Sequence, residues 1–248
     1  MKKCPYCSAE IKEGAFKCRC CKEKLYDLDN YEPEKVVDID GNEYSIVKIG
    51  NQKWMGHNLR VTHYRNGDPI PDLTDSRDSA ALFQPPLYSA WKSTTKGAYY
   101  NYPYNFEEEY PDFPITYGRM YNWYAVDDPR GVSPEGWHIP TIEEWGELAK
   151  YLGGDRIAGG KLKSKYDWNE PNVGASNESG FRALPCGDLM HGGSGYIEGG
   201  GIVAAFWSSS ETINSTNAWE QNLNHNSQGV WLKWSRKKSL INVRCVKD

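Results

Sequence analysis

Four cysteines near the N-terminus have the spacing of a metal site. Cys4 and Cys7 form one C-x2-C pair, and Cys18 and Cys21 form a second pair after ten intervening residues. Each C-x2-C turn aims two thiolates at one point, and two facing turns supply the four tetrahedral ligands that Zn²⁺ prefers. Because protein would fill every ligand position, the zinc would be structural and not catalytic.

The alternative for these thiols is disulfide pairing, which a reducing cytoplasm disfavours. Cys20 lies inside the second pair, but Cys18 with Cys21 keeps the two-residue gap, so we interpret Cys20 as a spectator. A segment of this length cannot bury an adequate core, so the metal would supply most of its folding free energy. Residues 1–25 resemble the short zinc ribbons, of the CPYC…CxxC type, found at the N-termini of many bacterial proteins.

Charge is unevenly distributed along the chain. Residues 1–25 contain seven Lys or Arg and three Glu, so with a net charge of -4 overall the remainder carries -8. An acidic surface repels phosphate backbones and anionic membranes, which makes nucleic acid a poor partner for the large part of the chain. A nucleic-acid or partner contact through the basic ribbon is an alternative, although solvated lysines explain its charge more simply.

No membrane span is expected, because no stretch approaches about 18 consecutive apolar residues. Lys2 and Lys3 make the N-terminus basic, but the apolar segment of a secretory signal does not follow them. On this basis we expect a cytoplasmic protein.

The rest of the chain is predicted to be rich in strands, turns and packed aromatic rings. The whole chain contains 10 Trp, 17 Tyr, 24 Gly and 14 Pro. This composition favours large rings packed in loop-rich structure. Residues 26–35 are polar, as in a linker, and residues 36–49 predict a hairpin about Asp40-Gly41. Further strands are expected at 204–209, 218–223, 229–234 and 240–246.

Two helices are expected. Residues 118–126 predict a short helix with aromatic side chains on its buried face. A longer helix follows Thr141, which forms a capping box with Glu144, and ends at Gly153-Gly154. We interpret residues 62–118 mostly as loop, and we expect the tyrosines at 99, 100, 102 and 104 to pack inside and not to bind sugar.

Several ordered blocks of sequence resemble one protein family. They are Asp38–Tyr44, Ile49–Met55 with Asn58-Leu59, Tyr117–Val126, Gly136–Thr141, Glu144-Trp145, Gly159–Lys163, Asn177–Phe181 with Ala183–Pro185, Phe206–Ser209 and Val243–Asp248. Together they resemble the Fibrobacter succinogenes major paralogous domain, and the resemblance runs through residues 36–248. That family is itself similar to the C-type lectin-like and formylglycine-generating-enzyme-like folds.

The resemblance implies an α+β, C-type lectin-like mixed fold in which the first and last strands pair, with two helices and long loops. The predicted organisation is a zinc ribbon at 1–25, a linker at 26–35 and the large domain at 36–248. Biochemically the family is poorly defined, so the resemblance implies a fold more than an activity. Its members are often exported, which the N-terminus of this chain does not support.

A calcium site of the lectin kind is not expected. Glu170-Pro171-Asn172, with Glu178 following, imitates the EPN arm of calcium-dependent lectins, and such oxygens suit Ca²⁺. The partner Trp-Asn-Asp arm is missing, because its nearest counterpart is Trp207-Ser208-Ser209. Hydroxyl groups are poor replacements for Asn and Asp as Ca²⁺ ligands.

An enzyme is also not expected. An oxidase of the formylglycine-generating type needs a close pair of reactive cysteines, but the large domain contains only Cys186 and Cys245, 59 residues apart. Buried structural thiols are the simpler interpretation, and a pair that meets in space is the alternative. His138, between two apolar residues, is interpreted as part of the scaffold, and no P-loop, GxSxG or HExxH motif occurs.

The best candidate for a binding surface lies near the C-terminus. Between Glu211 and Asn242 the sequence combines six Asn with Trp, His, Lys and Arg, a mixture typical of recognition surfaces on a stable scaffold. The candidate ligand-binding residues are Trp219, Glu220, Asn222, Asn224, His225, Asn226, Gln228, Trp231, Lys233, Trp234 and Arg236.

We therefore predict a non-catalytic module that binds a protein or carbohydrate ligand through residues 211–238 and the loop at 97–113. This C-terminal region also resembles the variable regions of lectin-fold proteins that retroelements diversify, in which adenine-directed mutagenesis starts from Asn codons. The alternative is a family that is naturally rich in Asn near its C-terminus.

Overall fold

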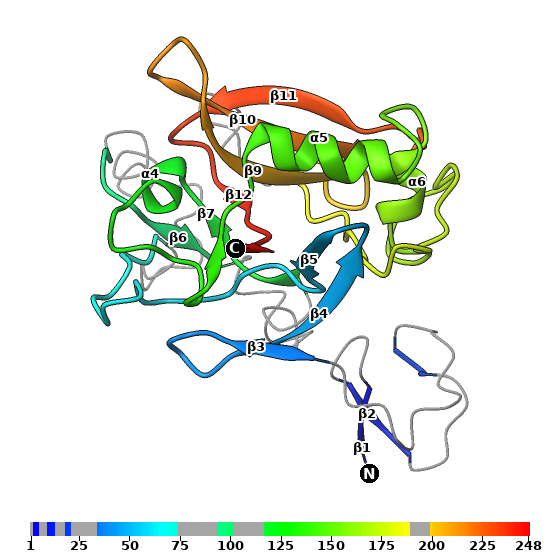
Figure 1. Ribbon diagram of the computed structural model, residues 1–248, viewed down its shortest axis with the longest axis horizontal. Coiled ribbons are helices and arrows are strands. Elements are labelled where there is room, and N and C mark those ends of the chain that lie inside the picture. The colour runs from blue at the N-terminus through cyan, green and yellow to red at the C-terminus, as the bar shows by residue number, and fades with distance from the viewer. Residues whose placement is uncertain are drawn as a thin grey trace, which may run out of the picture.

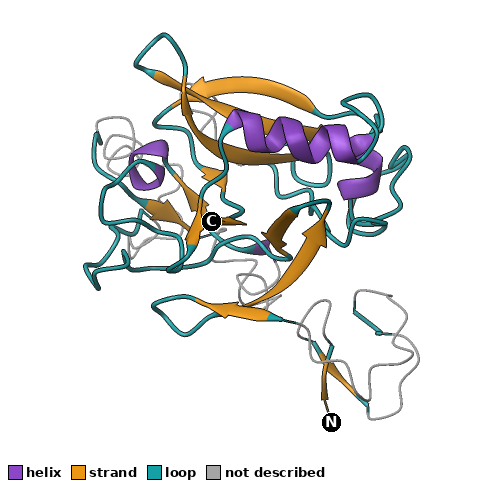
Figure 2. Ribbon diagram, viewed as in Figure 1, coloured by secondary structure: helices purple, strands orange, loops and turns teal. Residues whose placement is uncertain are grey.

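The computed structural model describes residues 2–4, 9–12, 18–20, 34–73, 94–101, 117–188 and 199–248. These residues form a mixed fold made mostly of strands, with two large sheets and three helices (Figures 1 and 2). The predicted mixture of helix and sheet is confirmed at this level. Within the described ranges, no helix combines the length and the apolar character needed to cross a membrane.

One large sheet has six strands in the order β11-β10-β9-β12-β7-β6. Its long strands are β9 (Val203–Glu211), β10 (Asn217–Asn224) and β11 (Trp231–Arg236), and its short ones are β6 (Tyr99–Tyr100), β7 (Met120–Tyr121) and β12 (Ile241–Asn242). The long strands form an antiparallel meander with β11 at the edge, close to the expected strands at 204–209, 218–223 and 229–234.

The second large sheet has five strands in the order β3-β4-β5-β13-β8. They are β3 (Lys35–Val37), β4 (Glu43–Ile49), β5 (Gln52–Met55), β13 (Val246–Lys247) and β8 (Trp137–His138). The hairpin predicted about Asp40-Gly41 is confirmed, and Gly41 has the positive φ of 79° that its turn requires. A further two-stranded sheet near the N-terminus pairs β1 (Lys2–Lys3) with β2 (Glu10–Ile11).

The prediction of one final strand over residues 240–246 is wrong. The chain leaves β12 in the six-stranded sheet and enters β13 in the five-stranded sheet, so residues 243–245 cross between the sheets. Arg244 lies in this crossing, is 1% exposed and donates side-chain hydrogen bonds to interior acceptors. The pairing expected between the first and last strands is also wrong, because β13 pairs with β5 and β8 and not with β3.

The capped helix predicted after Thr141 is confirmed as α5 (Ile142–Tyr151). The Thr141 hydroxyl accepts from the Glu144 N–H at 3.3 Å, and the Glu144 carboxylate accepts from the Thr141 N–H at 2.9 Å. A short helix α6 (Ala158–Leu162) follows. The helix predicted over 118–126 is shorter than expected, because its first residues form β7 and only α4 (Trp123–Val126) is helical.

Aromatic rings pack between α5 and the strands of the two sheets. The centroid of the Trp145 ring on α5 lies 4.7 Å from the centroid of the Trp54 ring on β5. It lies 5.8 Å from the centroid of the Phe206 ring on β9. Tyr99 and Tyr100 are buried, which confirms that these two rings pack inside, while Tyr102 and Tyr104 lie outside the described residues. The outer strands β10 and β11 thus rest on a densely packed support.

Candidate functional site

The hairpin of β10 and β11 carries most of the predicted ligand-binding residues. Residues directly opposite each other in an antiparallel pair point to the same face of the sheet, and successive residues alternate. Trp219 lies opposite Trp234 on one face. Glu220 lies opposite Lys233, and Asn222 opposite Trp231, on the other face. The structure therefore divides the predicted set between two faces.

The face with Trp219 and Trp234 is partly open to solvent. Trp234 is 59% exposed and Leu232, on the same face, is 45% exposed, whereas Leu223 further along β10 packs in the cluster beneath α5. Arg236 lies beyond Trp234 on this face and is exposed. Large apolar side chains beside a guanidinium group are the groups that protein and carbohydrate ligands contact most strongly.

The opposite face is exposed at its edge and buried towards the sheet centre. Trp231 is 40% exposed and Lys233 is also exposed, both on the edge strand. Glu220 and Asn222, on the neighbouring strand, are buried. Residue type alone does not predict that Glu220 and Asn222 are buried while Trp231 and Lys233 are exposed. Burial at these positions depends on strands and loops from elsewhere in the chain.

The remaining predicted residues lie at the end of the hairpin, where the chain is held to α6. Lys163, just after α6, is buried and its ammonium group donates hydrogen bonds to the carbonyls of Asn224, His225 and Ser227, at 2.9–3.4 Å. Burial lowers the pKa of Lys163 to about 8. Three carbonyl acceptors on one cation fix the loop at 224–228, so Asn224, Asn226 and Gln228 occupy a braced and not a freely moving segment.

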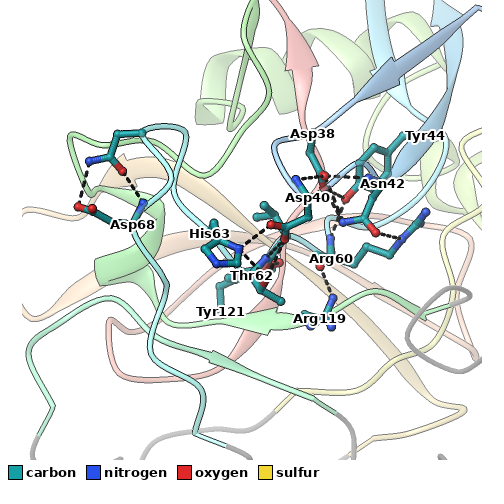
Figure 3. A network of polar contacts seen from close by, with 12 residues as sticks. Asp38, Asp40, Asn42, Tyr44, Arg60, Thr62, His63, Asp68, Arg119 and Tyr121 are labelled. Atoms are coloured by element: carbon teal, nitrogen blue, oxygen red, sulfur yellow. Dashed lines mark hydrogen bonds and ion pairs between the residues drawn. The ribbon is translucent and has the colours of Figure 1, made fainter.

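A dense polar network joins the first hairpin to the segment at 57–63 (Figure 3). One oxygen of the Asp38 carboxylate accepts the backbone N–H groups of Asp40 and Asn42, each at 2.9 Å, and the other accepts the Tyr44 hydroxyl at 2.5 Å. The Asp-x-Asp-x-Asn spacing resembles a cation-binding loop, but these oxygens are already used to fold the turn.

Asp40 extends the same network to His63. One Asp40 oxygen lies 2.6 Å from His63 Nδ1, and the other accepts from the backbone N–H and the hydroxyl of Thr62. These hydrogen bonds outweigh burial and keep the pKa of Asp40 below its usual value. Figure 3 shows the side chains pointing toward one another, and we interpret the network as a brace between loops.

Arg244 is a buried residue whose structural role the sequence pattern did not reveal. Its guanidinium donates two hydrogen bonds to Asn58 Oδ1 and one each to the carbonyls of Met55 and Phe181, at 2.6–3.1 Å. The Phe181 ring lies 4.3 Å from the guanidinium carbon. Burial lowers the pKa of Arg244 to about 9, and the amide and carbonyl acceptors compensate the buried charge.

The two cysteines of the large domain belong to separate buried clusters. Cys245 packs with the residues around Tyr121, and Cys186 packs with Met120 and Leu240. The Asn58 amide lies 3.4 Å from the Cys186 sulfur. Complete burial raises the pKa of Cys245 to about 12, so this thiol does not ionise near neutral pH.

The loop that imitates an EPN arm uses part of its polar groups for its own structure. The Glu178 carboxylate pairs with Lys161 at 3.0 Å. The Asn172 amide donates to the Ser164 carbonyl at 3.2 Å, and the Glu170 carbonyl lies 3.0 Å from His225 Nδ1. The loop is therefore tied to α6 and to the end of the β10–β11 hairpin.

His138 connects the C-terminal segment to the start of α5. Its Nδ1 lies 2.6 Å from the Asp248 carboxylate and its Nε2 lies 2.8 Å from the Glu144 carboxylate. Burial of the ring disfavours its charge, but the two carboxylates outweigh burial and raise the pKa of His138 above 6.5. The scaffold interpretation of His138 agrees with these contacts.

The raised pKa of His138 predicts a pH-dependent contribution to stability. Because the pKa of His138 is higher in the folded state than in the unfolded state, protonated His138 stabilises the fold. This contribution is fully present below the unfolded pKa of 6.5 and is lost as pH rises through the folded pKa. We expect His138→Gln to lower the melting temperature at pH 6 and to have a smaller effect at pH 9. The ring is 39% exposed, so the contribution is at most about 1 kcal/mol. A deficit that is equal at both pH values would contradict the prediction, and His225→Gln is the control.

Of the four predicted zinc ligands, the structure describes Cys4 and Cys18. Both are buried, at 1% and 0% exposed, whereas Cys20 is exposed. This difference fits the assignment of Cys18 as a ligand and of Cys20 as a spectator. Cys7 and Cys21 lie outside the described residues, so the complete ligand set stays a prediction.

The fold is that of a mixed domain made mostly of strands. A hairpin of polar and aromatic residues lies at the edge of one of its sheets. The family model of the Fibrobacter succinogenes major domain matches residues 47–247, and the chain therefore belongs to this family. This confirms the family predicted from the sequence blocks. No curated protein and no solved structure matches the chain.

Proposed function

We propose that this protein is a non-catalytic binding module that holds a protein or carbohydrate ligand on β10 and β11. The observation that carries the proposal is the edge strand β11, which exposes Leu232 and Trp234 on one face and Trp231 on the other. Exposed tryptophans cost solvation free energy in a free protein, and tryptophan is enriched where ligands bind.

The C-type lectin-like scaffold is part of the same proposal. Its support is the mixture of two sheets, few helices and long connecting segments in a chain of this family. The zinc ribbon is proposed as a separate structural unit at the N-terminus.

The cysteines of the large domain support a binding role over an oxidase of the formylglycine-generating type. Catalysis by a thiol needs an accessible thiolate, and the buried Cys245 with its raised pKa does not provide one near neutral pH. Cys186 is also buried, in a different cluster.

Diversification of this hairpin by a retroelement is proposed only for its exposed positions. Asn222 and Asn242 are buried, so variation there would disturb the sheet, whereas Asn214 and Asn226 are exposed. A nearby near-copy of the 3′ end beside a reverse transcriptase gene would support this extension. Absence of such a copy from the complete genome would contradict it.

The binding proposal predicts that tryptophan truncation removes affinity without unfolding the protein. The full chain is first screened on a glycan array and against displayed protein libraries. For a ligand identified there, we expect Trp231→Ala or Trp234→Ala to weaken binding by roughly 30-fold or more, since central aromatic contacts contribute about 2 kcal/mol or more each. Isothermal titration calorimetry measures the affinity, and circular dichroism checks the fold.

Tyr166→Ala is the matched control, because Tyr166 is an exposed aromatic residue outside β10 and β11. It is expected to bind like the wild type. Unchanged affinity in the variant that combines Trp219→Ala, Trp231→Ala and Trp234→Ala, with the fold intact, would overturn the proposed surface.

A further inference from the structure

The carboxylate of Glu220 is buried on β10, next to the edge strand, and forms no ion pair with a described residue, although Lys233 lies opposite it. The side chain is 0% exposed, and neither oxygen has a hydrogen bond of normal geometry within the described part of the chain, although Ser235 and Asn222 are near enough to lower its pKa. Burial, with the nearby charge of Asp188, raises the pKa of Glu220 to about 7, against the smaller lowering effects of Ser235, Lys233 and Asn222. A buried carboxylate of this kind is strongly unfavourable unless a cation or donor completes it.

Asn222 adds a second unsatisfied acceptor on the same face. It lies two residues after Glu220 on β10, so both side chains point to the same side of the strand. Asn222 is 2% exposed, and its Oδ1 also has no hydrogen-bond partner among the described residues. Three acceptor oxygens are therefore buried together with no donor assigned to them.

The register of the sheet brings Asp188 to the same place. Gly187 pairs with Ala204 in an isolated bridge, so Asp188 lies next to Ala205, and Ala205 lies directly opposite Asn222. Asp188 is 8% exposed. Asp188, Ala205 and Asn222 therefore lie in one row across neighbouring segments, with only the small side chain of Ala205 at the middle position.

The polar network of Figure 3 provides the contrast within the same molecule. There, the carboxylate oxygens of Asp38 and Asp40 are occupied by backbone N–H groups, hydroxyls and an imidazole. At Glu220 and Asn222, no hydrogen bond of normal geometry to these oxygens is formed within the described ranges. The first arrangement folds a turn, whereas the second offers ligand atoms.

We propose that Glu220, Asn222 and Asp188 form a binding site for one Ca²⁺ ion. Carboxylate and amide oxygens are the ligands that Ca²⁺ prefers, and two carboxylates balance its charge. The oxygens are closed off from solvent, so a compact ion fits them better than an organic ligand does. The site is independent of the loop at 170–178 and of the proposed ligand surface on β11. A bound ion would hold β10 to the segment at Asp188.

The test is calorimetric titration of the full, zinc-loaded chain with CaCl₂ in metal-free buffer, with MgCl₂ in parallel. We expect one Ca²⁺ per chain and weaker binding of Mg²⁺, which requires smaller, regular octahedral sites. Glu220→Gln keeps the shape but removes the charge, and it is expected to weaken Ca²⁺ binding by at least about 30-fold.

Glu170→Gln is the matched control, since it removes a carboxylate from the neighbouring loop, and it should bind Ca²⁺ like the wild type. Asp188→Asn is the second variant, in case Glu220→Gln fails to fold. The proposal is wrong if the wild type shows no Ca²⁺ binding up to about 10 mM, beyond the range of weak protein sites. It is equally wrong if the folded Glu220→Gln or Asp188→Asn variant binds as tightly as the wild type, or if Mg²⁺ binds as well as Ca²⁺. The Trp231→Ala and Trp234→Ala variants keep the three proposed Ca²⁺ ligands. The Ca²⁺ proposal and the proposed ligand surface on β11 can therefore fail independently of each other.

Discussion

Replacement of Arg244 by methionine is expected to lower the free energy of unfolding by roughly 3–5 kcal/mol. The guanidinium satisfies Asn58 and the carbonyls of Met55 and Phe181, all of them in the interior. Methionine fills part of the volume but donates nothing, so these acceptors would be left buried and unpaired. The crossing between β12 and β13 would also lose the contacts that hold it.

Urea denaturation followed by tryptophan fluorescence measures this loss, because Trp54 and Trp145 are buried beside the Arg244 contacts. The matched control is Arg156→Met, which removes an exposed arginine and is expected to change stability by less than about 0.5 kcal/mol. A loss below about 1 kcal/mol for Arg244→Met would mean that the acceptors find water or other donors. Asn58→Leu provides an independent test, since it removes the acceptor of two of the same hydrogen bonds.

The same residue shows why part of the fold could not be predicted from the sequence. Residues 240–246 alternate and carry β-branched side chains, so a continuous strand was the reasonable local prediction. Its interruption depends on Asn58 and Phe181, which are distant in sequence and supply the acceptors for Arg244. Local propensity cannot anticipate such partners.

Features fixed by neighbouring residues were predictable. The capping box of Thr141 and Glu144 and the turn at Asp40-Gly41 depend on groups four or fewer residues apart, and both occur as expected. The family was also predictable, because many ordered blocks of sequence carry it.

The candidate site was predictable only as a region. The sequence indicated the polar and aromatic composition of the hairpin, but not which side chains share a face. That division depends on the pairing of Trp219 with Trp234 and of Glu220 with Lys233, and a shift of one residue would reverse it. The burial of Glu220 further depends on β9 and on Asp188, which come from other parts of the chain.

The largest effect on a single segment is expected from removal of the zinc ligands. Cys4→Ser should abolish zinc binding, because one missing thiolate leaves the tetrahedral site incomplete. Structural zinc contributes on the order of 10–16 kcal/mol to the folding of small zinc-binding segments, and residues 1–25 have little apolar core to replace it. The N-terminal segment should therefore unfold without the metal, while the hydrophobic clusters of the large domain persist.

Zinc content per chain, measured by inductively coupled plasma mass spectrometry, gives the decisive comparison. The wild type is expected to contain one zinc per chain, from one four-cysteine site. Cys20→Ser is the matched control, since Cys20 is exposed while Cys4 and Cys18 are buried, and it should retain the metal. Loss of zinc in Cys20→Ser with retention in Cys18→Ser would show that the second pair uses Cys20 and that the two-residue spacing was misinterpreted. Equal retention in all variants would exclude the site altogether.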